Sequence, residues 1–269
     1  MRTRRIRVAL AGLAALTVVG LSGCGGGSDS NTGSTPSSAA SSAGVTGPVT
    51  VFAAASLTES FTKIGKDFEA ANPGAQVTFN FAGSSALATQ INQGAPADVF
   101  ASAAPANTKT VIDTGNADGA PATFAKNQLV IGVPKGNPKS FKGLSDLAKP
   151  GVKVAVCAPQ VPCGAAAQKA LATANVAITP VTLEQDVKAA LSKVKLGEVD
   201  AALVYRTDAK AAASDVDAVE FPESASAIND YPIVVLKNAP NKPGAQAFAA
   251  YVQSDKGKAV LSAAGFQAP

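Results

Sequence analysis

The chain has 269 residues, with 23 lysines and arginines, 19 aspartates and glutamates, three cysteines and no histidine. Without histidine, a Ser-His-Asp triad and a His-ligated metal site are both excluded, and no Gly-x-x-x-x-Gly-Lys-[Ser/Thr] nucleotide cradle is present. A carboxylate pair stays open from sequence alone, but Asp98, Asp200 and Asp208 stand singly. We therefore expect a protein that is not an enzyme and needs no cofactor.

Residues 1–23 have the pattern of a targeting segment. Arginines dominate its start, and residues 8–21 form an apolar run that is too short to span a bilayer comfortably. A Leu-Ser-Gly-Cys sequence that ends at Cys24 resembles the lipobox of bacterial lipoproteins. We expect an exported chain that Cys24, once lipidated, anchors to the outer face of the cytoplasmic membrane. The alternative is an ordinary cleavable signal with an incidental cysteine.

Removal of this segment changes the charge balance of the chain. It contains four arginines and no acidic residue, which leaves 19 basic against 19 acidic side chains in the rest. A formally neutral chain without basic runs and interleaved aromatics gives no reason to expect nucleic acid as a partner.

A change in composition separates a linker from the folded part. Residues 24–47 are mostly Gly, Ser, Thr, Ala and Asn, so we expect a lipidated cysteine followed by a flexible tether. The folded part then extends over about residues 48–269, which is enough for one large or two small domains.

A strand-to-helix junction opens the folded part. Residues 49–52 are β-branched or aromatic, and from Leu57 onward apolar residues recur at helical spacing, with small alanines and Ser56 between. The first amides of a helix have no internal partners, so an anion can bind there without Lys or Arg. The alternative is a capping box, in which the Ser56 hydroxyl satisfies only the Glu59 amide.

A second junction of the same kind follows within thirty residues. Residues 76–81 alternate like a strand, and a turn containing Ser84 and Ser85 leads into a run at helical spacing. Two serine-bearing turns favour the anion-site interpretation over capping alone.

Later segments continue the alternation of strand and helix. The strands we predict are near residues 99–101, 129–133, 152–156, 201–205, 218–221 and 233–236. The helices we predict are near residues 106–114, 163–174, 183–196, 245–253 and 256–264, the last closed by Gly265. This order predicts an α/β fold with mostly parallel sheets covered by helices on both faces.

Two of the cysteines are close in sequence. Cys157 and Cys163 flank Ala-Pro-Gln-Val-Pro at the passage from a predicted strand to a predicted helix. In an oxidising compartment we expect them to form a disulfide that fixes this loop. Two buried free thiols, or a redox pair without the usual Cys-x-x-Cys spacing, are the alternatives.

With these turns in order, the chain resembles the molybdate-binding proteins, the solute-binding components of bacterial ABC importers, from about residue 49 to residue 266. The motifs that carry the resemblance are Val-Phe-Ala-Ala-Ala-Ser-Leu at 51–57, Phe-Ala-Gly-Ser-Ser at 81–85, Gly-Ala-Pro-Ala-Asp-Val-Phe at 94–100, Val-Pro-Cys-Gly at 161–164, Asp-Val at 186–187 and Leu-Val-Tyr at 203–205. Each motif alone is weak, but six in the same order are specific.

The resemblance implies an oxyanion site made only of neutral donors. Ser56 and Ser84 would offer hydroxyls and nearby amides, Cys163 and Val187 their amides, and Tyr205 its phenol. Cys163 stands where the family usually has alanine, which is tolerable because that position supplies only an amide. Without the resemblance, Val187 reads as core packing and Tyr205 as a half-buried surface ring.

The resemblance also implies a two-lobed periplasmic-binding-protein fold of type II with the ligand between the lobes. The first lobe would comprise residues 48–125 and 229–269, and the second residues 126–228. The expected partners are molybdate, and also tungstate, together with the membrane permease of an importer, with the protein as a monomer. A binding protein for sulfate or another tetrahedral oxyanion is the nearest alternative, followed by a surface lipoprotein without a ligand.

Overall fold

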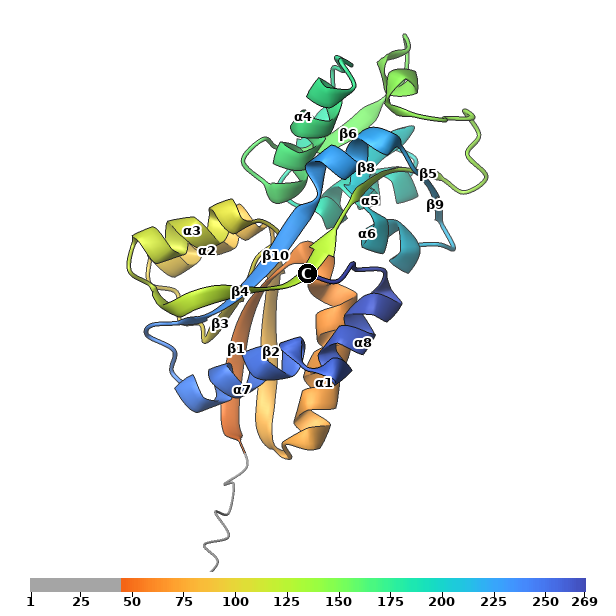
Figure 1. Ribbon diagram of the computed structural model, residues 1–269. Coiled ribbons are helices and arrows are strands. Elements are labelled where there is room, and N and C mark those ends of the chain that lie inside the picture. Colours follow the sequence, from red (N-terminus) through yellow and green to blue (C-terminus); the bar gives the residue numbers. More distant parts are fainter. Residues whose placement is uncertain (1–44) are drawn as a thin grey trace, which may run out of the picture. The chain divides into compact units, whose positions relative to one another are not determined.

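The computed structural model describes residues 45–269. The targeting segment, Cys24 and most of the predicted tether lie outside the described residues. Within residues 45–269, no helix has both the length and the apolar character needed to cross a membrane. The described part of the chain contains two five-stranded sheets, each covered by helices (Figure 1).

The first sheet has the strand order β2-β1-β3-β10-β4. Its strands are β1 (Thr46–Ala54), β2 (Gly74–Ala82), β3 (Val99–Ala101), β4 (Ala117–Asn127) and β10 (Asn229–Leu236). Strand β1 is parallel to β2 and β3, whereas β10 is antiparallel to β3 and β4. We call this sheet and its helices the first lobe.

Helices cover both faces of the first sheet. They are α1 (Thr58–Ala71), α2 (Ser84–Asn92), α3 (Pro105–Asp113), α7 (Lys242–Gln253) and α8 (Asp255–Ala264). Val49, Val51 and Ala53 of β1 share a core with α1, α7 and α8, while Phe52 points to the other face and packs with residues of α2 and α3. The period of two along a strand thus divides one strand between two cores. Figure 1 shows the helices on the two faces of this sheet.

The second sheet has the order β7-β6-β8-β5-β9 and, with its helices, forms the second lobe. Its strands are β5 (Leu129–Pro134), β6 (Val154–Cys157), β7 (Thr182–Glu184), β8 (Ala201–Tyr205) and β9 (Val216–Val219). Its α-helices are α4 (Pro162–Thr173), α5 (Val187–Lys195) and α6 (Arg206–Ala211). The chain passes between the two sheets at Gln128, between β4 and β5, and again between β9 and β10.

Short 3₁₀ helices complete the described elements. They are η1 (Ala55–Leu57), η2 (Leu144–Ala148) and η3 (Pro222–Ala227). The predicted stop at Gly265 is confirmed, because this glycine follows α8 with a left-handed φ of 101°.

The prediction of mostly parallel strands is wrong for half of the strand pairings. Strand β6 is parallel to β7 and β8, but β5 is antiparallel to β8 and β9, so both sheets are mixed. All four antiparallel pairings of the described strands involve β5 or β10, the two strands that enter a sheet directly after the chain has crossed from the other sheet.

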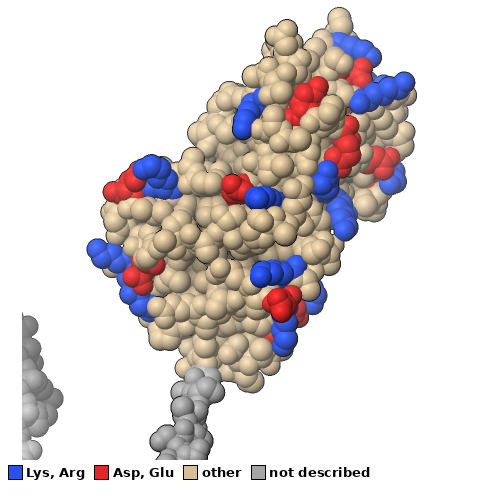
Figure 2. All heavy atoms as spheres, in the orientation of Figure 1, with Lys and Arg blue, Asp and Glu red and all other residues tan. Residues whose placement is uncertain are grey.

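The face shown in Figure 2 carries basic and acidic side chains interspersed among neutral ones. The described residues include exposed ion pairs within one helix, as in Lys63 with Asp67 and Lys109 with Asp113. Such exposed pairs contribute little to stability.

Candidate functional site

Ser56 lies inside η1, one turn before α1. Helix α1 begins at Thr58 with Leu57 at its N-cap, and no side chain caps it, so the capping-box interpretation of Ser56 is wrong. The Ser56 side chain is buried, and its hydroxyl lies 2.8 Å from the hydroxyl of Tyr231 on β10. A serine inside the 3₁₀ turn cannot reach the α1 amides as an N-cap residue does, which leaves its hydroxyl available to other partners.

Ser84 is the first residue of α2 and is buried. Its Oγ accepts a hydrogen bond of 3.0 Å from the Ala103 amide, so the hydroxyl proton can point elsewhere. The preceding Gly83 touches the second lobe, because a Cβ there would collide with the Gln185 carbonyl. This close approach requires glycine and places the α2 turn against the residues that lead into α5.

Cys157 and Cys163 are joined by a disulfide, with their Cα atoms 5.7 Å apart and both side chains buried. The expected pairing is therefore present in the structure, and the alternative of two buried free thiols is wrong. Cys157 ends β6 and Cys163 lies in the first turn of α4. The next residue, Gly164, lies so close to the Ala158 carbonyl that a Cβ would collide with it. The loop is thus held tightly against the N-terminus of α4.

Val187 is the first residue of α5, and Asp186 is the N-cap, accepting a hydrogen bond of 2.9 Å from the Ala189 amide. The Val187 side chain is buried in the core of the second lobe. Core packing and amide donation are therefore compatible, since the side chain points into the core while the N–H has no acceptor within the helix.

Tyr205 ends β8 and is 1% exposed, so its interpretation as a half-buried surface ring is wrong. Within residues 45–269, its hydroxyl has no hydrogen-bond partner. Burial raises the pKa of this phenol well above its usual value, with smaller contributions from Tyr231 and Asp208, so the group remains a protonated donor. A buried hydroxyl without a partner costs stability and points to a ligand that completes it.

These turns approach one another from both lobes. The Tyr205 ring packs edge-on against Tyr231 at 6.0 Å, and Tyr231 in turn contacts Ser56. On the other side, the Ala158 amide after Cys157 donates to the Glu184 carbonyl, just before the Gln185 that Gly83 touches. Helix α5 also contacts η1. All five predicted residues therefore lie on turns that contact at least one other turn of the set. Not every pair of these turns is in direct contact.

An ion-pair cluster lies beside these turns, and the sequence analysis did not predict its residues as part of the site. Lys188 of α5 pairs with Asp208 of α6 at 3.0 Å and, across the lobes, with Glu59 of α1 at 2.8 Å. Burial raises the pKa of Asp208 to about 6 despite the nearby Lys188 ammonium. Burial lowers the pKa of Lys188, but the charges of Asp208 and Glu59 raise it by more.

A network of neutral groups was also missed. Asn127 at the end of β4 donates to Thr207 Oγ1 at 2.9 Å and to Tyr231 Oη at 3.4 Å. No motif marks these positions, because Asn127 and Tyr231 lie at or near the ends of strands without a recognisable pattern and Thr207 lies in a helix of only six residues.

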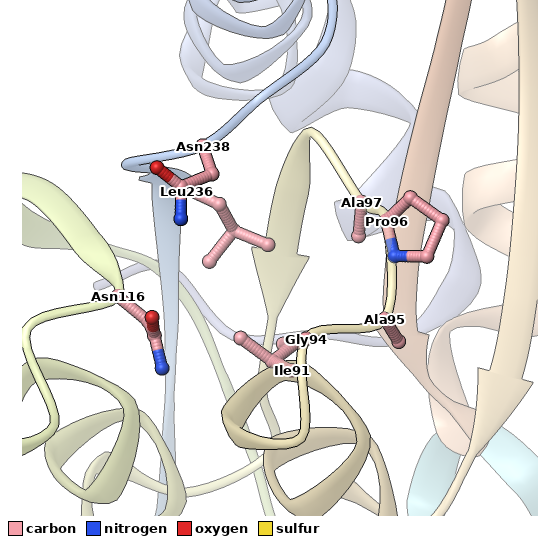
Figure 3. A pocket seen from close by; sticks show the side chains of 8 residues that line it. All are labelled: Ile91, Gly94, Ala95, Pro96, Ala97, Asn116, Leu236 and Asn238. Atoms are coloured by element: carbon pink, nitrogen blue, oxygen red, sulfur yellow. The ribbon is translucent and has the colours of Figure 1, made fainter.

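Two surface pockets differ in their relation to the site. A pocket of about 280 Å³ beside Ser56 is lined by residues of α1, α6 and the end of α8. Another, of about 180 Å³, contains Gly94, Ala95, Pro96 and Ala97 of the family motif but none of the predicted ligand residues (Figure 3). Asp98 of the same motif has a structural role, because it accepts hydrogen bonds from the amides of Thr50 and Asn241.

Comparisons with known proteins agree with this architecture. The molybdate-binding protein ModA of Mycobacterium tuberculosis is 46% identical over 221 residues, covering 82% of this chain and 85% of that protein. A putative ABC transporter substrate-binding lipoprotein of Bacillus subtilis, YvgL, is 32% identical over 227 residues, covering 82% of this chain and 86% of that protein. The solved substrate-binding domain of a putative molybdenum ABC transporter from Clostridium difficile superposes with a TM-score of 0.63 at 27% identity, covering 82% of this chain and 99% of that one.

A family model matches nearly the whole described part of the chain. It is the model of bacterial extracellular solute-binding proteins, and it spans residues 49–267. Together with the two-lobed α/β architecture, this match shows that the chain belongs to the family of bacterial extracellular solute-binding proteins.

Proposed function

We propose that the protein binds molybdate outside the cytoplasm and delivers it to an ABC importer, and that it also accepts tungstate. The observation that carries the proposal is the buried hydroxyl of Tyr205, which has no hydrogen-bond partner among residues 45–269 and lies next to the buried hydroxyl pair of Ser56 and Tyr231. The name of the Mycobacterium tuberculosis relative supports the choice of anion.

The proposed ligands are neutral donors. Ser56 and Ser84 supply hydroxyls, Cys163 and Val187 supply amides from the first turns of α4 and α5, and Tyr205 supplies its phenol. A dianion that leaves water needs many hydrogen bonds, and donors that are already oriented meet it with little reorganisation. The helix N-termini add partial positive charge without a counter-ion.

Neutral donors also favour fully ionised oxyanions. A hydrogen phosphate ion brings a proton that would meet no acceptor in such a site, which lowers its affinity. Sulfate is fully ionised as well, so the site separates it from molybdate and tungstate mainly by cavity size. Sulfate binding by the same arrangement of donors is the second candidate function.

The anion binds between the lobes and favours their closure, which the permease of the importer recognises. The resemblance places the first lobe at residues 48–125 and 229–269 and the second at residues 126–228. In the structure the first sheet begins slightly earlier, at Thr46, and β4 continues it to Asn127. The contacts of Lys188 with Glu59 and of Gly83 with Gln185 support this scheme, because they join elements of both lobes around the proposed site. Binding and release, without catalysis, are the whole of the proposed function, and the protein acts as a monomer.

Lipidation of Cys24 anchors the protein to the outer face of the cytoplasmic membrane, and the segment between Cys24 and β1 serves as its tether. This tether ends before residue 47, because Thr46 and Gly47 already pair with β2. The lipobox-like sequence and the Bacillus subtilis relative named as a lipoprotein support this part of the proposal. The Cys157–Cys163 disulfide fits an oxidising compartment outside the cytoplasm.

Equilibrium titration of the purified tag-free domain with molybdate, tungstate, sulfate and phosphate tests the proposal. We expect saturable binding of molybdate and tungstate at one site per chain, with sulfate and phosphate at least tenfold weaker. Preference for sulfate would establish the second candidate function instead, and no binding of any tetrahedral oxyanion would refute both.

A further inference from the structure

A chain of hydrogen bonds leads from the crossing between the lobes to Ser56. The Gln128 amide donates to Asn127 Oδ1 at 2.9 Å, and Asn127 Nδ2 lies 3.4 Å from Tyr231 Oη. Tyr231 Oη lies 2.8 Å from Ser56 Oγ. Asn127 and Tyr231 are buried, with exposed fractions of 1% and 0%. Water therefore does not compete for these bonds in the structure.

The directions of the Asn127 bonds follow from the first one. A backbone N–H can only donate, so Asn127 Oδ1 faces Gln128 and Nδ2 faces Tyr231 and Thr207. Because Nδ2 is a donor only, the Tyr231 oxygen accepts from it. Either hydroxyl can donate in the Tyr231–Ser56 bond, and the arrangement that leaves the Ser56 proton free to point at an anion is the one in which Tyr231 donates. Burial raises the pKa of Tyr231 above its usual value, which keeps this phenol protonated.

Ser84 shows the same arrangement in a simpler form. Its oxygen accepts directly from the Ala103 amide, so its proton is also free to donate. Each buried serine therefore has a protein donor within reach of its oxygen, the Ala103 amide for Ser84 and the Tyr231 hydroxyl for Ser56.

We infer that Tyr231 and Asn127 are positioning residues that set Ser56 as a hydrogen-bond donor to the bound oxyanion. This inference rests on the proposed function. The relay makes the site selective, because a Ser56 hydroxyl turned the other way would present a lone pair, which repels a dianion and accepts the proton of a hydrogen phosphate.

The location of the relay links it to the crossing between the lobes. Asn127 ends β4, Gln128 leads into β5 of the second lobe, and Thr207 on α6 shares the Asn127 amide. The same amide thus contacts a hydroxyl of each lobe, Tyr231 in the first and Thr207 in the second.

The substitution Tyr231→Phe tests the inference, because it removes the hydroxyl and keeps the ring. We expect molybdate affinity to fall roughly tenfold, since Ser56 loses its orientation and each 1.4 kcal/mol corresponds to a factor of ten. We also expect phosphate to lose less affinity than molybdate. Tyr251→Phe is the matched control, because Tyr251 of α7 packs on Phe68 of α1 and lies outside the relay. The molybdate affinity of this control should stay within twofold of wild type.

A double-mutant cycle separates positioning from general structure. In a Ser56→Ala background, Tyr231→Phe should change molybdate affinity by less than twofold, because no hydroxyl remains to be oriented. An equal loss in both backgrounds would show a structural effect and overturn the inference. If Tyr231→Phe does not fold, Asn127→Ala carries the same cycle, with an expected loss of roughly threefold or more in the wild-type background and none with Ser56→Ala.

The outcomes for the two proposals can be told apart. A wild-type protein that does not bind molybdate would refute the proposed function and, with it, the role of the relay. A wild type that binds molybdate, together with a folded Tyr231→Phe variant within twofold of its affinity, would overturn the relay alone.

Discussion

Tyr205→Phe should weaken ligand binding without weakening the fold. The Tyr205 hydroxyl is buried and has no partner among the described residues, and leaving such a group unsatisfied costs about 1 to 3 kcal/mol. Its removal should therefore leave the free energy of unfolding of the ligand-free protein unchanged or raise it. With molybdate bound, the same hydroxyl donates to a dianion, and a hydrogen bond to a charged group contributes about 1.5 to 3 kcal/mol.

The expected loss in affinity is thus about tenfold to a hundredfold. Thermal unfolding with and without molybdate measures both effects, because a ligand at a hundred times its dissociation constant stabilises the folded state by about 2.7 kcal/mol. The variant should show an equal or higher melting temperature when free and a smaller increase when molybdate is added. Tyr251→Phe serves as the control. A variant that unfolds at a lower temperature when free, with a dissociation constant within twofold of wild type, would refute the reasoning.

Four further predictions concern other parts of the chain. Ser84→Ala should weaken molybdate binding by about tenfold in titration, because a donor to the anion is lost; an unchanged dissociation constant would remove Ser84 from the site. Reduction of the Cys157–Cys163 disulfide should lower the free energy of unfolding in urea by about 2 kcal/mol, and alkylation of both cysteines without reductant would contradict the bond. The Asp208 pKa of about 6 lies above the usual 3.8, so the folded protein holds this proton more tightly than the unfolded chain. The stability that protonated Asp208 contributes is therefore fully present below about pH 4 and is lost as the pH rises to about 6. Urea unfolding of wild type relative to Asp208→Asn should show this loss between pH 4 and 6, and a constant difference would contradict the burial of a titrating carboxyl. Cys24→Ala should release a folded protein from the membrane fraction, and retention after a salt wash would contradict lipid anchoring.

Local patterns were sufficient to predict much of the fold. The change of period near Ser56 predicted β1 and α1, because each buries one apolar face whose spacing is visible in the sequence. Strand β4 was missed because it contains Gly119 and Pro121 and is exposed over much of its first half. Helix α6 has only six residues, fewer than two full turns, and so gives almost no periodic signal.

The polar network of the site was beyond reach for a different reason. Ser56 and Tyr231 are separated by 175 positions, and Asn127 and Thr207 by 80. Their contacts depend on how the two crossings bring β4, β10 and α6 together, which no local spacing encodes. Ser56 itself was visible because the turn that carries it has a local signature, whereas the residue that orients it has none.

The most direct test of the account is the molybdate titration of the wild-type domain beside Ser56→Ala. The account predicts saturable binding at one site per chain in the wild type and an affinity at least tenfold lower in the variant, because a hydroxyl donor to a buried dianion is removed. It also predicts a lower melting temperature of the free variant, because the buried Tyr231 hydroxyl loses its Ser56 partner. A variant that binds molybdate within twofold of wild type, or a wild type that prefers sulfate, would contradict the central claim.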